Sequence, residues 1–250
     1  MSQTLKFLIS ETAGTKSVNN KSCYYKKDGV LIIINCGRGV ANAVKKSGVL
    51  KDVKEVYQVL THDSMDHIYD IKPFFEYVKA ETGSLPKLID SISYKKNKLK
   101  KLGIKDGDDY ISVEPLKNNF NWINFLVVPH SDKSISCPIE LYLNNKKIFY
   151  AGDCGAIPFS IENYNEYYVD FADKQSEYFM YPEKIKELAR KNKIRKDKLW
   201  VVHLRNVRAM EIAQMAGMQV AKEEKRKFAT LSKMPKKLKK EVSQKNQNQI

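Results

Sequence analysis

The four histidines of this chain all lie at positions where a single metal site could use them. His62 and His67 are close enough in sequence to share one loop, and His130 and His203 each follow an apolar run. Another apolar run ends at Asp153. A strand that ends on such a residue brings it to the rim of a sheet, where binding sites gather. Because no histidine is used elsewhere, the pattern indicates a site rather than packing.

The residue types indicate hydrolytic metal chemistry. Imidazole and carboxylate ligands suit Zn, Mn or Fe(II). Adjacent Asp66 and His67 could bind one ion while His62 faces another, and Asp153 could lie between the two ions. Two such ions would stabilise the attacking and leaving oxygens of a displacement, and would lower the pKa of a bridging water enough to supply hydroxide near neutral pH.

The order of these residues resembles the metallo-beta-lactamase superfamily. Its motif is Thr-His-x-His-x-Asp-His, followed by a lone His, a lone Asp and a final His, each at a strand end. The corresponding series here is Thr61-His62-Asp63-Ser64-Met65-Asp66-His67, then His130, Asp153 and His203. Within the superfamily the chain looks most like the ribonuclease Z and phosphodiesterase branch, because Ile34-Asn35-Cys36-Gly37-Arg38-Gly39 is similar to that branch's Asp-Cys-Gly-Glu-Gly turn.

The resemblance implies an α+β fold, a four-layer αββα sandwich, with zinc as the expected metal and Mn or Fe as alternatives. It also implies two ligand sets that share Asp153. The first ion would keep His62, His130 and Asp153, and the second would keep Asp66, His67, Asp153 and His203. Asp63 lies in the same loop and is a candidate proton acceptor.

Two residues depart from the family pattern. Ser64 stands where the family has its second histidine, and a serine hydroxyl is a poor ligand because it must be deprotonated to bind well. Asn35 stands where the family has an aspartate that supports the site from behind. The sequence therefore predicts one firm metal site and one weak one.

Each candidate has a simpler interpretation when taken alone. His130 or His203 could be a half-buried packing residue, Asp153 a turn residue, and Asp66 a helix cap. Only their joint order favours a metal centre. Cys154 could reach a metal beside Asp153, but the four cysteines are better interpreted as small buried thiols than as ligands or disulfides.

Hydrophobic periodicity and turn residues predict strands and helices that alternate along the chain. Strands are expected over 6–10, 22–25, 30–35, 53–60, 86–90, 109–113, 120–128, 140–143, 147–151 and 198–202, and helices over 40–46, 66–81, 95–102, 182–192 and 207–217. The aromatic and acidic stretch 157–181 stands apart. It could be a substrate lid, a dimer surface, or aromatic residues packed on their own core.

The 250 residues suffice for one large domain, expected over 1–221, followed by a basic, partly disordered extension over 222–250. The extension holds ten basic and three acidic residues, so it contributes much of the +15 net charge. This imbalance favours anionic partners, such as a phosphate-bearing small molecule or RNA. No apolar run approaches the roughly 20 residues needed to span a bilayer, and no signal peptide is evident, so we expect a cytoplasmic protein without a membrane partner, with a homodimer as one option.

These features together predict a metal-dependent hydrolase, most simply a phosphodiesterase acting on a nucleotide or RNA through metal-activated hydroxide. Asp66, Asp63 and Asp153 are the residues expected to serve the reaction directly. Two alternatives stay open. The protein could be a degenerate member of the fold that serves as a binding or scaffold module, as Ser64 and Asn35 suggest. It could also hydrolyse a thioester or lactone.

Overall fold

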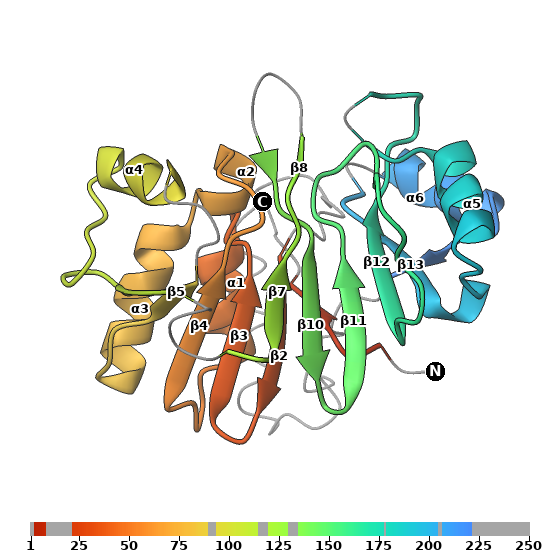
Figure 1. Cartoon of the computed structure of the whole chain (residues 1–250). Coiled ribbons are helices and arrows are strands. Elements are labelled where there is room, and N and C mark those ends of the chain that lie inside the picture. Colours follow the sequence, from red (N-terminus) through yellow and green to blue (C-terminus); the bar gives the residue numbers. More distant parts are fainter. Residues whose placement is uncertain are drawn as a thin grey trace, which may run out of the picture.

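The computed structural model describes residues 3–8, 22–89, 94–114, 120–129, 135–177, 179–204 and 207–221. Within these residues two six-stranded sheets pack face to face, with helices on their outer faces (Figure 1). The order of layers is therefore helices, sheet, sheet and helices, as expected for an αββα sandwich. The predicted extension over 222–250 lies outside the described residues.

The first sheet has the strand order β1-β2-β3-β4-β5-β6. Its strands are β1 (Lys6–Phe7), β2 (Cys23–Lys27), β3 (Val30–Ile34), β4 (Glu55–Val59), β5 (Lys87–Ile89) and β6 (Ile111–Val113). The strands from β3 to β6 run parallel, while β1, β2 and β3 pair antiparallel. The parallel pairing brings the carboxyl ends of β3 and β4 to one edge, where the first group of candidate residues begins.

The second sheet has the order β14-β13-β12-β11-β10-β7. Its strands are β7 (Ile123–Phe125), β10 (Ile139–Leu143), β11 (Lys146–Tyr150), β12 (Glu166–Asp170), β13 (Leu199–Val202) and β14 (Gln219–Val220). The strands from β11 to β14 are parallel, so the ends of β11, β12 and β13 also share one edge. A short antiparallel ribbon of β8 (Val128–Pro129) and β9 (Ile135–Ser136) is separate from both sheets.

Helices cover the outer face of each sheet (Figure 1). They are α1 (Val40–Ser47), α3 (Ile71–Thr82) and α4 (Tyr94–Lys101) in the first half, and α5 (Pro182–Lys191) and α6 (Val207–Met215) in the second. The short helix α2 (Met65–Ile68) lies at the edge of the first sheet (Figure 1). A short 3-10 helix spans Lys196–Lys198. None of the helices among these described residues is both long and apolar enough to cross a membrane.

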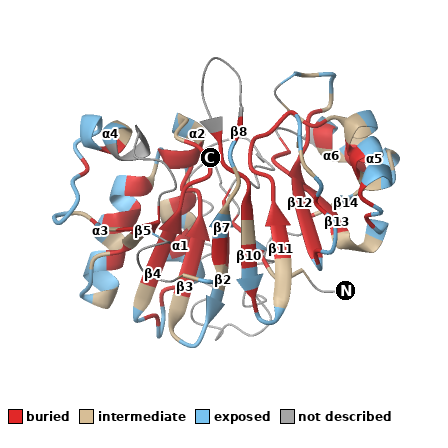
Figure 2. Ribbon diagram, viewed as in Figure 1, coloured by how far each residue is buried: buried red, intermediate tan, exposed pale blue. Residues whose placement is uncertain are grey.

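The buried apolar residues form three clusters that match this arrangement. Figure 2 shows that much of the length of the strands is buried. In β3, Leu31 and Ile33 pack toward the helices while Ile32 and Ile34 join the layer between the sheets. This alternation follows from the two-residue period of a strand. A parallel strand covered on both faces reads as a continuous apolar run, and Val30–Ile34 is such a run.

The prediction of one helix over 66–81 is wrong, because the structure divides it into α2 and α3. The break lies at Tyr69 and Asp70. The backbone N–H of Asp70 donates to the carbonyl of Cys36 at 3.0 Å, and its carboxylate accepts from the N–H of Ala41 at 3.2 Å. These contacts with the turn after β3 replace the continuing helix, and they fix α2 against the first sheet.

The lid interpretation of 157–181 is wrong for the centre of that stretch, which is the buried strand β12. Tyr167 and Tyr168 are buried, so the third interpretation, packing on the core, holds for them. The sequence does not predict this strand because Glu166 and Asp170 make it resemble an acidic loop. Both carboxylates are in fact buried inside the protein.

Candidate metal centre

The loop after β4 and the short helix α2 bring three polar side chains to the edge of the first sheet. His62 and His67 are buried, whereas Asp66 is half-buried. The two imidazole rings lie close together, with 5.4 Å between the ring centres of His62 and His67. The turn after β3 supports this loop so tightly that a Cβ on Gly37 would lie 2.1 Å from the Asp66 carbonyl oxygen. Only glycine allows that approach.

Asn35 supports the same loop from behind. Its side-chain oxygen accepts hydrogen bonds from the backbone N–H and the hydroxyl of Thr61, each at 3.1 Å. Asn35 has φ of 59°, a left-handed conformation that Asn tolerates better than most residues. Burial raises the pKa of the neighbouring Tyr150 well above its usual value, and a hydrogen bond with Asn35 opposes that rise. The amide thus anchors Thr61 by acceptor bonds without adding a negative charge.

Asp153 approaches from the second sheet, beyond the end of β11. The chain turns at Gly152, where φ is 63° and a Cβ would lie 3.1 Å from the Thr61 hydroxyl oxygen. This turn presents the Asp153 carboxylate to the loop after β4, and the side chain is buried. Residues from the two sheets therefore meet at one rim.

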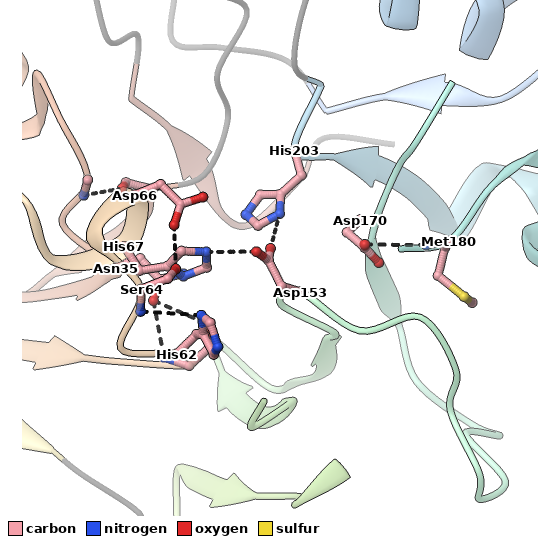
Figure 3. Close-up of polar contacts among 12 residues, drawn as sticks. Asn35, His62, Ser64, Asp66, His67, Asp153, Asp170, Met180 and His203 are labelled. Carbon is pink, nitrogen blue, oxygen red and sulfur yellow. Dashed lines mark hydrogen bonds and ion pairs between the residues drawn. The ribbon is translucent and has the colours of Figure 1, made fainter. Parts of the chain in front are cut away.

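The Asp153 carboxylate lies between two imidazoles (Figure 3). One oxygen is 3.1 Å from Nε2 of His67, and the other contacts Nδ1 of His203. His203 follows β13 directly and has φ of 63°, which turns its ring back toward Asp153. A left-handed conformation at a non-glycine residue is uncommon and is often found at functional sites.

His62, His67 and Asp153 each offer a ligand atom, and these atoms all lie within 4.8 Å of one another. Two ligands on one tetrahedral zinc ion would be about 3.3 Å apart, given metal–ligand distances near 2 Å. The 3.1 Å distance between His67 and Asp153 matches that value. The atom so placed is Nε2, and the other ring nitrogen of His67, Nδ1, is buried without a hydrogen-bond partner among the described residues. The donor set therefore fits a divalent metal.

His62 is less ready to bind than His67. Its Nδ1 accepts a hydrogen bond from the backbone N–H of Ser64 at 3.3 Å. While that bond persists, a neutral ring carries its proton on Nε2, so binding through Nε2 requires the other tautomer. The Ser64 hydroxyl itself donates to the Asp66 carboxylate (Figure 3).

Two other candidates among the described residues, Asp63 and Cys154, are not members of this cluster. His130 lies outside the described residues, and β8 ends just before it. Asp63 is half-buried, and no hydrogen bond or ion pair within the described part of the chain joins it to the cluster. Cys154 is buried, its thiol donates to the carbonyl of Ala156 at 3.3 Å, and burial raises its pKa.

Asp170 is a buried carboxylate that the sequence alone did not place at the site. It ends β12, between the strands that lead to Asp153 and His203 (Figure 3). Burial raises its pKa well above the usual value, and the nearby charge of Asp153 raises it further. One of its oxygens accepts from the backbone N–H of Met180 at 3.3 Å. Asp170 stands at the end of a parallel strand, and that position would indicate a site residue once β12 is identified as a strand.

All four cysteines are buried thiols that form no disulfide, as the interpretation as small thiols requires.

Solved structures similar to this chain include the three that follow. YhfI from Bacillus subtilis, a metallo-beta-lactamase fold protein, aligns with a TM-score of 0.62 at 17% identity, covering 86% of this chain and 94% of its own. A diphosphatase from the PhnP family aligns with a TM-score of 0.61 at 17% identity, and the alignment covers 82% of each chain. The short form of human tRNase Z aligns with a TM-score of 0.56 at 12% identity, and the alignment covers 80% of this chain and 91% of the tRNase Z chain.

No protein-family model and no curated protein matches the sequence. The similarity is therefore one of structure, and it spans most of the chain. It agrees with the two-sheet architecture of the chain. On these grounds the chain has the metallo-beta-lactamase fold.

Proposed function

We propose that this protein is a metal-dependent hydrolase that cleaves phosphodiesters in nucleotides or RNA. The observation that carries the proposal is the meeting of residues from both sheets, with Asp153 between His67 and His203 and with His62 within reach. Such a concentration of buried imidazole and carboxylate groups is costly to bury without a charged ligand. A bound divalent metal offsets that cost.

His67, Asp153 and His203 would hold the firm site, with Asp66 as the fourth ligand. A metal bound there lowers the pKa of water and neutralises negative charge that develops on a phosphate. The protein's own residues fix the ligands. Asn35 anchors Thr61, and Ser64 holds the Asp66 carboxylate by a hydrogen bond. Loss of a hydrogen bond that orients a metal ligand typically lowers metal affinity by roughly 10–100-fold.

The choice of a phosphate substrate has two supports. The net charge of +15 favours anionic substrates. Two of the similar structures are named as a diphosphatase and a tRNase Z. Zinc is the metal we favour because imidazole and carboxylate ligands suit it, with Mn or Fe as alternatives.

The first experiment measures metal per chain, by elemental analysis of protein purified without chelators or an affinity metal. The same preparation is then assayed with bis(4-nitrophenyl) phosphate. We expect about one metal ion or more per chain and hydrolysis that Asp153→Ala abolishes. Asp108→Ala is the matched control, because Asp108 is an exposed residue in a turn remote in sequence from the cluster. Absence of metal after zinc is added back would contradict the proposal.

A second candidate function is a binding or scaffold module that has lost catalysis. The contacts of Ser64 favour it, since one engages Nδ1 of His62 and the other engages Asp66. Metal binding without hydrolysis of any phosphodiester would support this candidate. A thioester or lactone hydrolase is the remaining option, and activity on such esters but not on phosphodiesters would identify it.

A further inference from the structure

The turn after β3 places a cation next to the helix that carries two of the proposed ligands. Gly37 packs against the backbone of Asp66 so closely that no side chain fits between them. The next residue is Arg38, which is exposed. Arg38 is thereby held beside α2, on the same rim as the proposed metal centre.

Arg38 lies over the ring of Tyr69, with 4.3 Å between the guanidinium carbon and the ring centre. Tyr69 directly follows α2 and is 47% exposed. Both partners of this cation–π pair are therefore accessible from solvent. A cation on an aromatic face at this distance is attracted by the ring, and the contact restrains the long arginine side chain.

The Arg38 guanidinium keeps its hydrogen-bonding capacity. Within the described residues no carboxylate lies at ion-pair distance from it. Asp70 is a neighbour of Tyr69 in sequence, but its carboxylate accepts from the N–H of Ala41 and so stabilises the start of α1. The guanidinium has five N–H donors, and a phosphate can accept two of them side by side.

An aromatic ring beside a fixed guanidinium suits a ligand that has both a phosphate and a flat ring. Nucleobases stack on tyrosine rings and on guanidinium planes. A simple phosphate would use only the guanidinium, whereas a nucleoside would use only the ring. The pair therefore favours a nucleotide over either part alone.

We infer that Arg38 and Tyr69 form a nucleotide subsite beside the metal centre, in which Arg38 binds a phosphate that is not cleaved and Tyr69 stacks on the base. The inference rests on the proposed function for its biological meaning, because it names a nucleotide as the substrate class. The binding itself is measurable without any hydrolysis.

The test measures binding of 5′-AMP, adenosine and inorganic phosphate to the full-length protein by calorimetry. AMP contains no phosphodiester, so a phosphodiesterase leaves it intact. We expect AMP to bind at least about tenfold more tightly than adenosine or phosphate. Arg38→Ala and Tyr69→Leu should each weaken AMP binding by about five- to tenfold. Arg38→Lys should recover little, since an ammonium group cannot stack or bind in a bidentate way.

Arg190→Ala is the matched control, because Arg190 is an exposed arginine on α5 whose loss changes the net charge equally. Equal weakening by Arg38→Ala and Arg190→Ala would mean general charge attraction and would overturn the inference. Loss of AMP binding in Arg38→Ala but not in Tyr69→Leu would mean a phosphate site only, and would also overturn it.

Failure of the inference is distinguishable from failure of the proposed function. A protein that hydrolyses bis(4-nitrophenyl) phosphate but binds AMP equally well with and without Arg38 overturns the subsite alone. A protein that binds AMP through Arg38 and Tyr69 but hydrolyses no phosphodiester retains the subsite and overturns the hydrolase.

Discussion

The Ser64 hydroxyl donates a hydrogen bond to the carboxylate of Asp66, two residues further along the loop. Ser64 stands where the family motif has a histidine, and in this position it contacts a proposed ligand. The substitution therefore has a structural consequence beyond a missing donor. It would restrain a ligand of one proposed ion site while it removes a ligand from the other proposed site.

Ser64→His should raise the metal content per chain. The new imidazole would stand with His62 and Asp153 and complete the weaker ligand set that the family motif describes. Elemental analysis before and after dialysis against added zinc measures the change. Ser64→Ala is the control, since it removes the hydrogen bond to Asp66 without adding a ligand. Unchanged metal content in Ser64→His would contradict the placement of the weaker site.

Removal of metal should lower the melting temperature. A ligand that binds only the folded state at 100 times its Kd adds about 2.7 kcal/mol, which corresponds to roughly 5–10 °C in a protein of this size. We expect a chelator to cause such a shift in the wild type and almost none in Asp153→Ala, because its carboxylate contacts both His67 and His203. Differential scanning fluorimetry with and without chelator checks this. An equal shift in both proteins would place the metal elsewhere.

Gly37→Ala should destabilise the protein and disturb the loop that carries Asp66. The added Cβ would lie 2.1 Å from a backbone carbonyl, which cannot move aside like the end of a flexible side chain. We expect a loss of about 2 kcal/mol or more in the free energy of unfolding, measured in urea. Gly83→Ala serves as the control, because Gly83 has φ of 70° with nothing within 4 Å of an added Cβ. Its expected cost is only the backbone strain of about 1 kcal/mol. Similar losses in the two variants would show that the contact with Asp66 is unimportant.

The sequence predicted the strands well where turn chemistry marks their ends. The hairpin at Asn144 and Asn145 is an example, since both residues have positive φ and join β10 to β11. Two neighbouring residues in left-handed conformations are typical of a tight hairpin, and Asn tolerates them. Such a turn depends on the conformational preferences of its own residues, so it can be predicted without knowledge of tertiary contacts.

Tertiary contacts explain what the sequence could not predict. The end of α2 depends on the contact between Asp70 and Cys36, which are far apart in sequence. The strand β12 depends on partners for Glu166 that come from both Thr4 and Lys146. The order of site residues could be predicted from the motif, but the contact of Asp153 with two imidazoles required the fold. The stacking of Arg38 on Tyr69 gave no sequence signal beyond their nearness to the motif.

Glu166 should make the stability of the protein sensitive to acid. The carboxylate accepts hydrogen bonds from the N–H and hydroxyl of Thr4 at 2.8 and 2.6 Å, and from the Tyr168 hydroxyl at 2.6 Å. The Lys146 ammonium is also 2.6 Å away. Burial raises the pKa of Glu166, but the bonds from Lys146, Thr4 and Tyr168 outweigh it, so the net pKa lies below the usual 4.5.

The direction of the pH effect follows from that lowered pKa. The unfolded chain takes up the proton at higher pH than the folded protein does, so the stabilisation is complete above the usual value of 4.5 and is lost as the pH falls through the folded pKa. Urea unfolding of wild type and Glu166→Gln at several pH values between neutral and acid isolates this contribution. We expect the wild type to have a larger free energy of unfolding than Glu166→Gln at neutral pH. This difference should narrow as the pH falls below 4.5, the usual pKa of a glutamate. Glu187→Gln, on an exposed helix pair with Lys191, should show little difference from the wild type at any pH. If the difference in free energy of unfolding between wild type and Glu166→Gln stayed constant through the acid range, the charge of Glu166 would contribute nothing to stability. Packing around β12 alone would then hold Thr4 in place.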